Sequence, residues 1–135
     1  MVEIIIFDTS VLVDDLRTGC HQGRIASLSG LIRTSSVVLA ELWRGATQAS
    51  EQKFLRTLER NHPVLTPTLQ NWIESGQLLA KVRKSKGFAP EKLRDLHFDV
   101  LIALSVRSHG ARLITSNRSD FELIQHFIKF RLDVW

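Results

Sequence analysis

The residues Ile4-Ile5-Ile6-Phe7-Asp8-Thr9-Ser10 come almost at the start of the chain, and the prediction of the fold begins with them. Four consecutive apolar residues followed by polar ones are typical of a strand that is buried on both faces, as the strands of parallel sheets are. The polar residues that come next are typical of a helix start. A buried strand that leads directly into a helix favours an α/β fold. It also puts Asp8 at the carboxyl end of the strand, the edge at which open α/β sheets bind ligands.

The remainder of the chain continues this alternation of helix and strand patterns. We expect Thr9 or Ser10 to cap a helix that runs through Leu16 and ends at Gly19. Further helices are expected over residues 25–31, from 35 or 36 to about 49, over 51–60, from Pro67 to a loop marked by Gly87 and Pro90, over 96–109 and over 117–124. Short strands are expected over residues 3–7, 33–36, 112–115 and 128–134. This order predicts an α/β fold around a short central parallel sheet.

Length and composition are those of one domain covering residues 1–135. Hydrophobic residues make up 44% of the chain and charged residues 24%, which is ordinary for a globular protein. No apolar run approaches the roughly 20 residues that span a membrane, and the first residues lack the pattern of a signal peptide. Cys20 is the only cysteine, so no disulfide can form within the chain. We therefore expect a cytoplasmic protein without a membrane anchor.

The formal net charge of +4 is compatible with a nucleic acid partner. Six of the eighteen cationic side chains lie between residues 81 and 94, where only Glu91 opposes them. Such a run is either a contact surface for phosphates or simply the solvated end of a helix. The candidates for contacts with a nucleic acid backbone are Arg44, Lys84 and Lys86.

Two aspartates lie where a carboxylate is unexpected. Asp8 follows a buried strand, although an aspartate there can also serve as a helix N-cap. At 100° per residue, Asp99 shares its helix face with Ile102, Ala103 and Val106, which are all apolar. A carboxylate on a core-facing stripe must be paired, protonated or bound to a cation, because its desolvation costs many kcal/mol. A structural ion pair with a buried arginine is the alternative for Asp99.

Glu41 gives a weaker signal of the same kind. It lies near a helix start, and on its C-terminal side the same helix face carries Arg44 and Gly45. A glycine inside a helix costs about 1 kcal/mol relative to alanine, which indicates the close approach of another backbone or a ligand. An exposed glutamate beside Arg44 is the alternative.

A polar stretch, residues 115–120, follows the strand expected at 112–115 and should reach the same sheet edge as Asp8. Asp120 either completes an acidic cluster as a catalytic residue or caps a short helix. Asn117 offers a neutral oxygen ligand in its place. We also expect hydroxyl and amide groups from both segments to hydrogen-bond the carboxylates or their bound water, namely Thr9, Ser10, Ser116 and Asn117.

If Asp8, Glu41 and Asp99 converge, they need a cation. Two carboxylates about 5 Å apart repel by roughly 3 kcal/mol at an effective dielectric constant of about 20. A few carboxylate oxygens, completed by water, suit Mg²⁺ or Mn²⁺, whereas no spacing of Cys and His typical of zinc is present. Such ions activate water and clamp phosphodiester oxygens. The pattern therefore favours a metal-dependent hydrolase acting on phosphodiesters.

The sequence resembles the PIN domain and, within it, the VapC-type toxins of bacterial toxin–antitoxin pairs. Four segments carry the resemblance in the family's order: Ile6-Phe7-Asp8-Thr9-Ser10-Val11-Leu12, Ala40-Glu41-Leu42-Trp43-Arg44-Gly45, Phe98-Asp99-Val100-Leu101-Ile102-Ala103, and Leu113-Ile114-Thr115-Ser116-Asn117-Arg118-Ser119-Asp120-Phe121. The resemblance implies a PIN-like α/β/α sandwich and a Mg²⁺- or Mn²⁺-dependent endoribonuclease. It also implies a homodimer inhibited by a small cognate antitoxin.

The resemblance places Asp8, Glu41 and Asp99 on the family's invariant acids, and either Asn117 or Asp120 on its variable fourth position. Three alternatives stay open at this point. The chain could be an RNA-processing PIN nuclease that is not a toxin, or a binding module without catalysis. It could also be a signalling receiver domain with Thr115 as its switch hydroxyl, although that alternative gives Glu41 and Asp99 no role.

Overall fold

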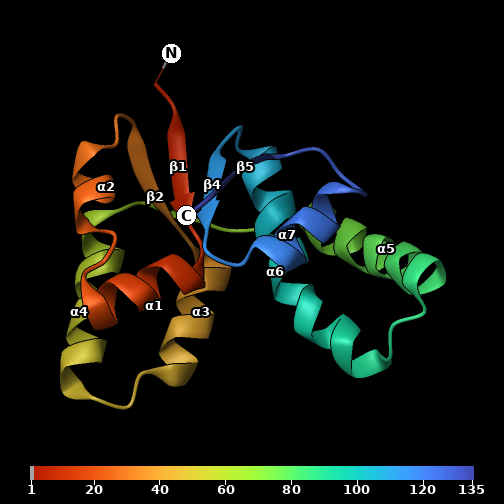
Figure 1. Cartoon of the computed structure of the whole chain (residues 1–135), viewed down its shortest axis with the longest axis horizontal. Helices are drawn as coiled ribbons and strands as arrows, with labels where there is room; N and C mark the ends of the chain where they lie inside the picture. The colour runs from red at the N-terminus through yellow and green to blue at the C-terminus, as the bar shows by residue number, and fades with distance from the viewer. Residues whose placement is uncertain (1) are drawn as a thin grey trace.

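A computed structural model of the chain describes residues 2–135. Its centre is a five-stranded sheet whose paired strands are all parallel, in the order β3-β2-β1-β4-β5 (Figure 1). The strands are β1 (Ile4–Phe7), β2 (Leu31–Ser35), β3 (Val64–Leu65), β4 (Arg112–Thr115) and β5 (Arg131–Val134). The first strand of the chain is thus the middle strand of the sheet, so its carboxyl end lies at the centre of the ligand-binding edge.

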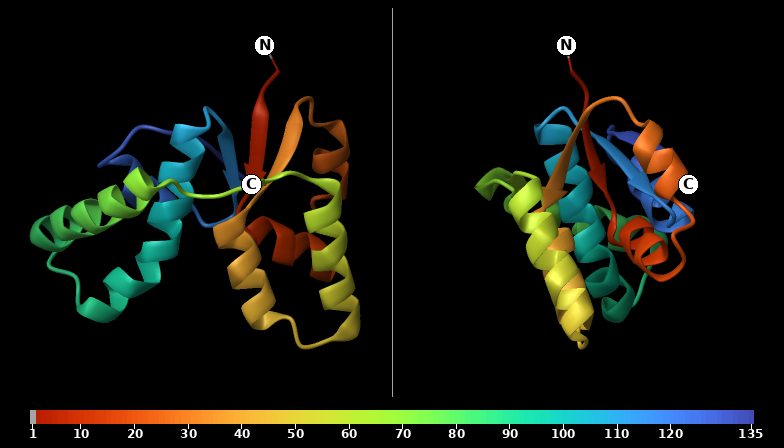
Figure 2. Two further views of the ribbon diagram at one scale, coloured as in Figure 1. Left: turned by 180° about the vertical axis from the view of Figure 1, so that it is seen from behind. Right: turned by 90° about the vertical axis from the view of Figure 1, so that its left-hand side faces the viewer.

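Seven helices connect and cover the strands: α1 (Thr9–Thr18), α2 (Gln22–Ser27), α3 (Ser36–Gly45), α4 (Ala49–Asn61), α5 (Leu69–Lys86), α6 (Pro90–Ser108) and α7 (Arg118–Gln125). In the edge-on view, α1 and α2 lie on one face of the sheet, and α4 and α6 lie on the other (Figure 2). The predicted α/β/α sandwich with a short parallel sheet is confirmed. Within residues 2–135, no helix combines the length and the apolar character that a membrane crossing requires.

Helix α6 is the most deeply buried helix of the fold. Every residue from Val100 to Val106 is buried, so this segment has no solvent-facing side. It packs against α5, α7, α3 and strand β4. A helix that is apolar all round belongs inside a protein, and its continuous burial fixes the position of any side chain that it carries.

Several helix bounds differ from the prediction because capping groups override the hydrophobic pattern. Asp8, not Thr9 or Ser10, occupies the N-cap position of α1, whose end at Gly19 agrees with the prediction. The helix expected to reach residue 49 instead ends at Gly45, and a capping box of Gln48 and Glu51 starts α4 separately. The cap of α3 is Ser35, which accepts hydrogen bonds from two backbone N–H groups at 3.2 and 3.5 Å.

Other corrections follow from strand pairing and from proline. Leu31 belongs to β2 and not to the helix expected over 25–31, because it pairs in register with Ile4 of β1. The strand β3, only two residues long, was not predicted. Pro67 precedes the helix that it was expected to open, since Thr68 is the cap of α5. Pro90 does not lie in a loop but is the first residue of α6, which therefore begins six residues before Leu96. Strand β5 is shorter than expected and begins at Arg131.

Gly30 allows the close packing of β1 against β2. Its φ is +151°, and a Cβ placed there would lie 2.8 Å from the carbonyl oxygen of Glu3. That carbonyl already accepts a hydrogen bond from the N–H of Leu31 at 2.8 Å, so it has no room to move away. A side chain at position 30 must therefore displace one of the two strands.

We expect Gly30→Ala to lower the free energy of unfolding by about 1–3 kcal/mol, as measured by urea denaturation. The matched control is Gly76→Ala in α5, where nothing lies within 4 Å of the added methyl group. That substitution should raise the free energy of unfolding by about 0.5–1 kcal/mol, because alanine is the better helix former. Equal stabilities of the Gly30→Ala variant and the wild-type protein would contradict the strand contact.

Candidate metal centre

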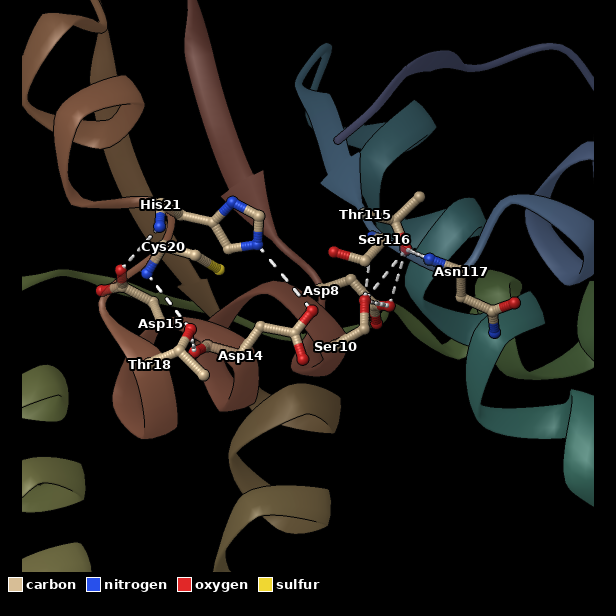
Figure 3. Close-up of polar contacts among 10 residues, drawn as sticks. All are labelled: Asp8, Ser10, Asp14, Asp15, Thr18, Cys20, His21, Thr115, Ser116 and Asn117. Carbon is tan, nitrogen blue, oxygen red and sulfur yellow. Dashed lines mark hydrogen bonds and ion pairs between the residues drawn. The ribbon is translucent and has the colours of Figure 1, made fainter.

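Asp8 holds the N-cap position of α1 but does not cap it. Its side chain makes no hydrogen bond to the N–H groups of the helix. Instead Oδ2 accepts hydrogen bonds from Ser10 Oγ and from Thr115 Oγ1, each at 2.8 Å (Figure 3). The side chain is nearly buried, with 3% exposure, and the described contacts leave Oδ1 for another partner. The N-cap alternative for Asp8 is thus not supported by its hydrogen bonds.

Glu41 comes from the middle of α3 and faces the same place. Its Oε1 accepts a hydrogen bond from Thr9 Oγ1 at 2.9 Å, which ties α3 to the start of α1. Burial raises the pKa of the Glu41 carboxyl group, and the negative charge of Asp8 raises it further, while the hydrogen bond from Thr9 and the charge of Arg44 oppose the shift. No backbone among the described residues approaches Gly45 closely, since a Cβ there would meet nothing within 4 Å. The approach of a ligand at Gly45 stays a prediction.

Asp99 lies on α6 among apolar neighbours. Ile102, Ala103 and Val106, which share its helix face, are all fully buried, as the sequence pattern predicted. Burial raises the pKa of Asp99 to about 8, with further contributions from the charges of Asp8, Glu41 and Asp120. No arginine forms an ion pair with Asp99 in the described residues, so the structural alternative has no partner there.

The three carboxylates meet in one place. One oxygen from each of Asp8, Glu41 and Asp99 lies within 4.8 Å of the others. Each comes from a different element, namely the end of β1, helix α3 and helix α6. Three converging carboxylate oxygens, with room for water at the remaining positions, are a donor set that fits Mg²⁺ or Mn²⁺. The residues present therefore fit a hard divalent cation.

The fourth acidic candidate lies outside this group. Asp120 accepts hydrogen bonds from Lys92 Nζ at 3.0 Å and from Asn117 Nδ2 at 3.2 Å. Asn117 is the N-cap of α7, and its side chain points away from Asp8 (Figure 3). Asp120 is close enough for its charge to raise the pKa of Asp99. A role of Asp120 or Asn117 as a metal ligand stays a prediction.

The model of the PIN domain family matches residues 5–126. The chain belongs to the PIN domain family. This membership implies a nuclease, and PIN nucleases use divalent metals, in agreement with the three converging carboxylates. It also argues against the receiver-domain alternative.

Solved structures that resemble this PIN domain are described as VapBC assemblies. VapBC-1 from nontypeable Haemophilus influenzae is 24% identical, with a TM-score of 0.72 over 98% of both chains. DNA-bound VapBC from Salmonella typhimurium is 25% identical, with a TM-score of 0.68 over 100% of this chain and 99% of that chain. VapBC2 from Rickettsia felis, bound to a promoter fragment, is 22% identical with a TM-score of 0.73. No curated protein matches the chain significantly by sequence.

Two residues of the PIN domain site were missed by the sequence reasoning. Thr115 at the end of β4 is fully buried and orients Asp8, whereas the sequence alone offers it a role only as the switch hydroxyl of a receiver domain. Its role depends on the parallel pairing of β1 with β4, which places the two strand ends side by side and which no local sequence pattern reveals. Lys92 pairs with Asp120 across 28 positions of sequence, and no local pattern reveals such a pair.

The polar residues expected around the acids are only partly engaged with them. Thr9 and Ser10 hydrogen-bond Glu41 and Asp8, as predicted. Ser116 contributes its backbone N–H to Ser10 Oγ at 3.0 Å, and its own hydroxyl is buried without a partner among the described residues. Asp8 and Glu41 are thus held by hydroxyl groups from α1 and β4, whereas Asp99 is positioned by the burial of its helix.

Two depressions flank Glu41. The larger, of about 570 Å³, lies between α1, α3 and α4 and is lined partly by Thr9, Arg17 and Phe54. The smaller, of about 180 Å³, lies between α3 and α6. Glu41 lines both, so an extended ligand that occupies both depressions passes this member of the acidic cluster.

The raised pKa of Asp99 predicts how pH affects stability in the presence of a chelator. An aspartate in the unfolded chain titrates near pH 4, and Asp99 in the folded protein near pH 8. Between these values the folded state holds a proton that the unfolded state has lost, so the free energy of unfolding falls as pH rises from 4 to 8 and then levels off.

Asp99→Asn removes this titration. We expect the variant to be more stable than the wild-type protein by several kcal/mol at pH 8.5 and by much less at pH 4.5, as measured by urea unfolding with EDTA, because each unit of pKa difference is worth about 1.4 kcal/mol. Asp95→Asn, which removes an exposed carboxylate one turn earlier in α6, should leave the pH dependence unchanged. A stability gain that is the same at both pH values would refute the role of the Asp99 charge.

Proposed function

We propose that this PIN domain is a divalent-metal-dependent endoribonuclease that hydrolyses RNA phosphodiester bonds and acts in the cytoplasm as the toxin of a VapBC-type toxin–antitoxin module. The observation that carries the proposal is the convergence of Asp8, Glu41 and Asp99, whose carboxylate oxygens lie within 4.8 Å of one another. Mg²⁺ and Mn²⁺ suit these oxygen ligands.

The three carboxylates would hold the metal, and hydroxyl groups fix the orientation of two of them, Asp8 and Glu41. A bound divalent ion supplies activation of water and charge stabilisation for hydrolysis of a phosphodiester. Ser10 and Thr115 hold Asp8 Oδ2, and Thr9 holds Glu41 Oε1, so these side chains keep their positions when substrate arrives. Ile102 and Ala103 keep water away from the helix face behind Asp99. Preorganised charges of this kind need no rearrangement during the reaction.

RNA as the substrate is supported by the resemblance to VapC-type toxins and by the net charge of +4. The proposal of an antitoxin partner is supported by the VapBC structures, and by a Klebsiella pneumoniae toxin–antitoxin complex that is 21% identical with a TM-score of 0.58. A homodimer is proposed from the resemblance alone. The second candidate function is RNA processing without toxicity. It would use the same carboxylate site and differs only in which RNA is cleaved.

Removal of one carboxylate should abolish cleavage without unfolding the protein. We expect Asp8→Asn and Asp99→Asn each to reduce cleavage of total RNA in the presence of Mn²⁺ by at least about 100-fold. Asp14→Asn, an exposed position on the same helix as Thr9, is the control and should retain full activity. Full activity of both site variants, purified free of contaminating nucleases, would rule out the mechanism.

Titration calorimetry with Mn²⁺ separates the enzyme from a non-catalytic module. We expect binding to the wild-type protein and to Asp14→Asn, and its loss in Asp99→Asn. The absence of binding to the wild-type protein would favour the module.

The toxin role is tested by expression in a bacterial host. Induction of the wild-type chain should stop growth, and induction of Asp8→Asn at the same protein level should not. Co-expression of the antitoxin encoded beside it should restore growth. Normal growth with a wild-type chain that cleaves RNA in vitro would favour RNA processing over toxicity.

A further inference from the structure

The smaller depression beside Glu41 has a lining that suits a nucleic acid backbone. Its walls are Glu41 and Arg44 from α3, and Arg94, Asp95 and Phe98 from α6. Two of these residues adjoin the acidic cluster directly, since Glu41 belongs to it and Phe98 is the neighbour of Asp99 in sequence. A group bound in this depression therefore lies against one of the three carboxylates, that of Glu41.

The two arginines of the depression are free to bind a ligand. Arg44 is exposed and makes no hydrogen bond or ion pair to any residue from 2 to 135. In the described part of the chain, the one ion pair of Arg94 is with Glu91 at 3.7 Å, and both side chains are at least 70% exposed. An exposed ion pair of this length contributes little, so its exchange for another anion costs little. Both guanidinium groups thus keep the planar fork of donors that matches phosphate oxygens.

The size of the depression indicates part of a long ligand. At about 180 Å³ it is smaller than the 300–1,000 Å³ that is typical of small-molecule sites. A phosphate with its sugar is a suitable unit, and the half-buried ring of Phe98 offers an apolar surface to the sugar or base. The larger depression on the other side of Glu41 gives the same chain a place to continue.

The lysines suggested by the sequence are less well placed. Lys84 and Lys86 lie in the last turn of α5. Figure 1 shows the end of α5 and the loop to α6 at the margin of the molecule, away from the carboxyl ends of the strands. They attract polyanions in general, whereas Arg44 and Arg94 line a depression that touches the site.

We propose that Arg44 and Arg94 bind the phosphate of a nucleotide next to the scissile one, with Phe98 against its sugar or base, and so position the RNA strand over the carboxylates. This proposal rests on the proposed ribonuclease function. In it the two arginines are positioning residues, and Asp95, whose charge opposes theirs, weakens the subsite.

The test measures RNA binding separately from cleavage. The probe is a fluorescein-labelled single-stranded oligoribonucleotide of 12 nucleotides and random sequence, titrated in EDTA and followed by anisotropy. We expect Arg94→Ala to weaken binding by about 5–10-fold and to reduce the slope of log K against log salt by about 0.7, the value for one lost phosphate contact in a single strand. Lys84→Ala removes the same charge from α5 and should change binding less than 2-fold. Asp95→Asn should strengthen binding.

Arg44→Ala should behave as Arg94→Ala does, and Arg44→Lys should recover only part of the affinity, because an ammonium group lacks the fork of donors. In cleavage assays with Mn²⁺, Arg94→Ala should raise KM and leave kcat within 3-fold. Circular dichroism checks that each variant is folded.

The outcomes distinguish the two proposals. Equal affinities of Arg94→Ala, Lys84→Ala and the wild-type protein, in a wild-type chain that cleaves RNA, would overturn the subsite and leave the ribonuclease intact. So would a variant that binds the antitoxin more weakly but RNA normally, since the arginines would then contact protein. A wild-type chain that neither binds the probe nor cleaves RNA would overturn the ribonuclease and the subsite together.

Discussion

Mutual repulsion of three carboxylates is the constraint on which the arrangement of this molecule depends. Asp8, Glu41 and Asp99 are held within 4.8 Å of one another, although their charges and their partial burial both oppose it. The fold holds them together by giving each a rigid support. Asp8 follows the central strand, Glu41 lies on a helix capped by Ser35, and Asp99 directly precedes the segment of α6 that is buried on all sides. A cation between them removes the repulsion, so the energy that the fold spends on this cluster is recovered when metal binds.

Part of this site could be predicted because local sequence and tertiary position coincide there. A strand buried on both faces reads as a continuous apolar run, so Asp8 could be placed at its end. Asp99 could be singled out because helical spacing puts it on a fully apolar face, and that face is buried. The errors lie where local rules compete. The hydrophobic pattern runs on past Gly45, but the capping box at Gln48 and Glu51 separates the two helices. The sequence pattern of residues 25–31 predicts that Leu31 is helical, but Leu31 pairs with Ile4 in the sheet.

The remaining features depend on contacts that no local pattern specifies. Thr115 orients Asp8 only because β4 pairs with β1, and this pairing depends on the strand order of the whole sheet. Lys92 was counted as one charge in a basic run, but it is bound to Asp120 from another helix. The same run contains Arg94, which lines a depression, and Lys84, which does not. The basic run in the sequence therefore indicated that the ligand is a polyanion. Which of its cationic residues line a depression beside the carboxylates is decided by the packing of α3 against α6.

The complete burial of α6 from Val100 to Val106 has an evolutionary consequence. Its side chains touch the core in every direction, so a substitution there disturbs the hydrolytic centre and the scaffold at once. The walls of the two depressions beside Glu41 come largely from exposed and half-buried side chains of α1, α3, α4 and the first turns of α6, which can change with a smaller penalty. Descendants of one ancestral nuclease can therefore acquire new targets by changing these rims while the chemistry at their centre stays fixed.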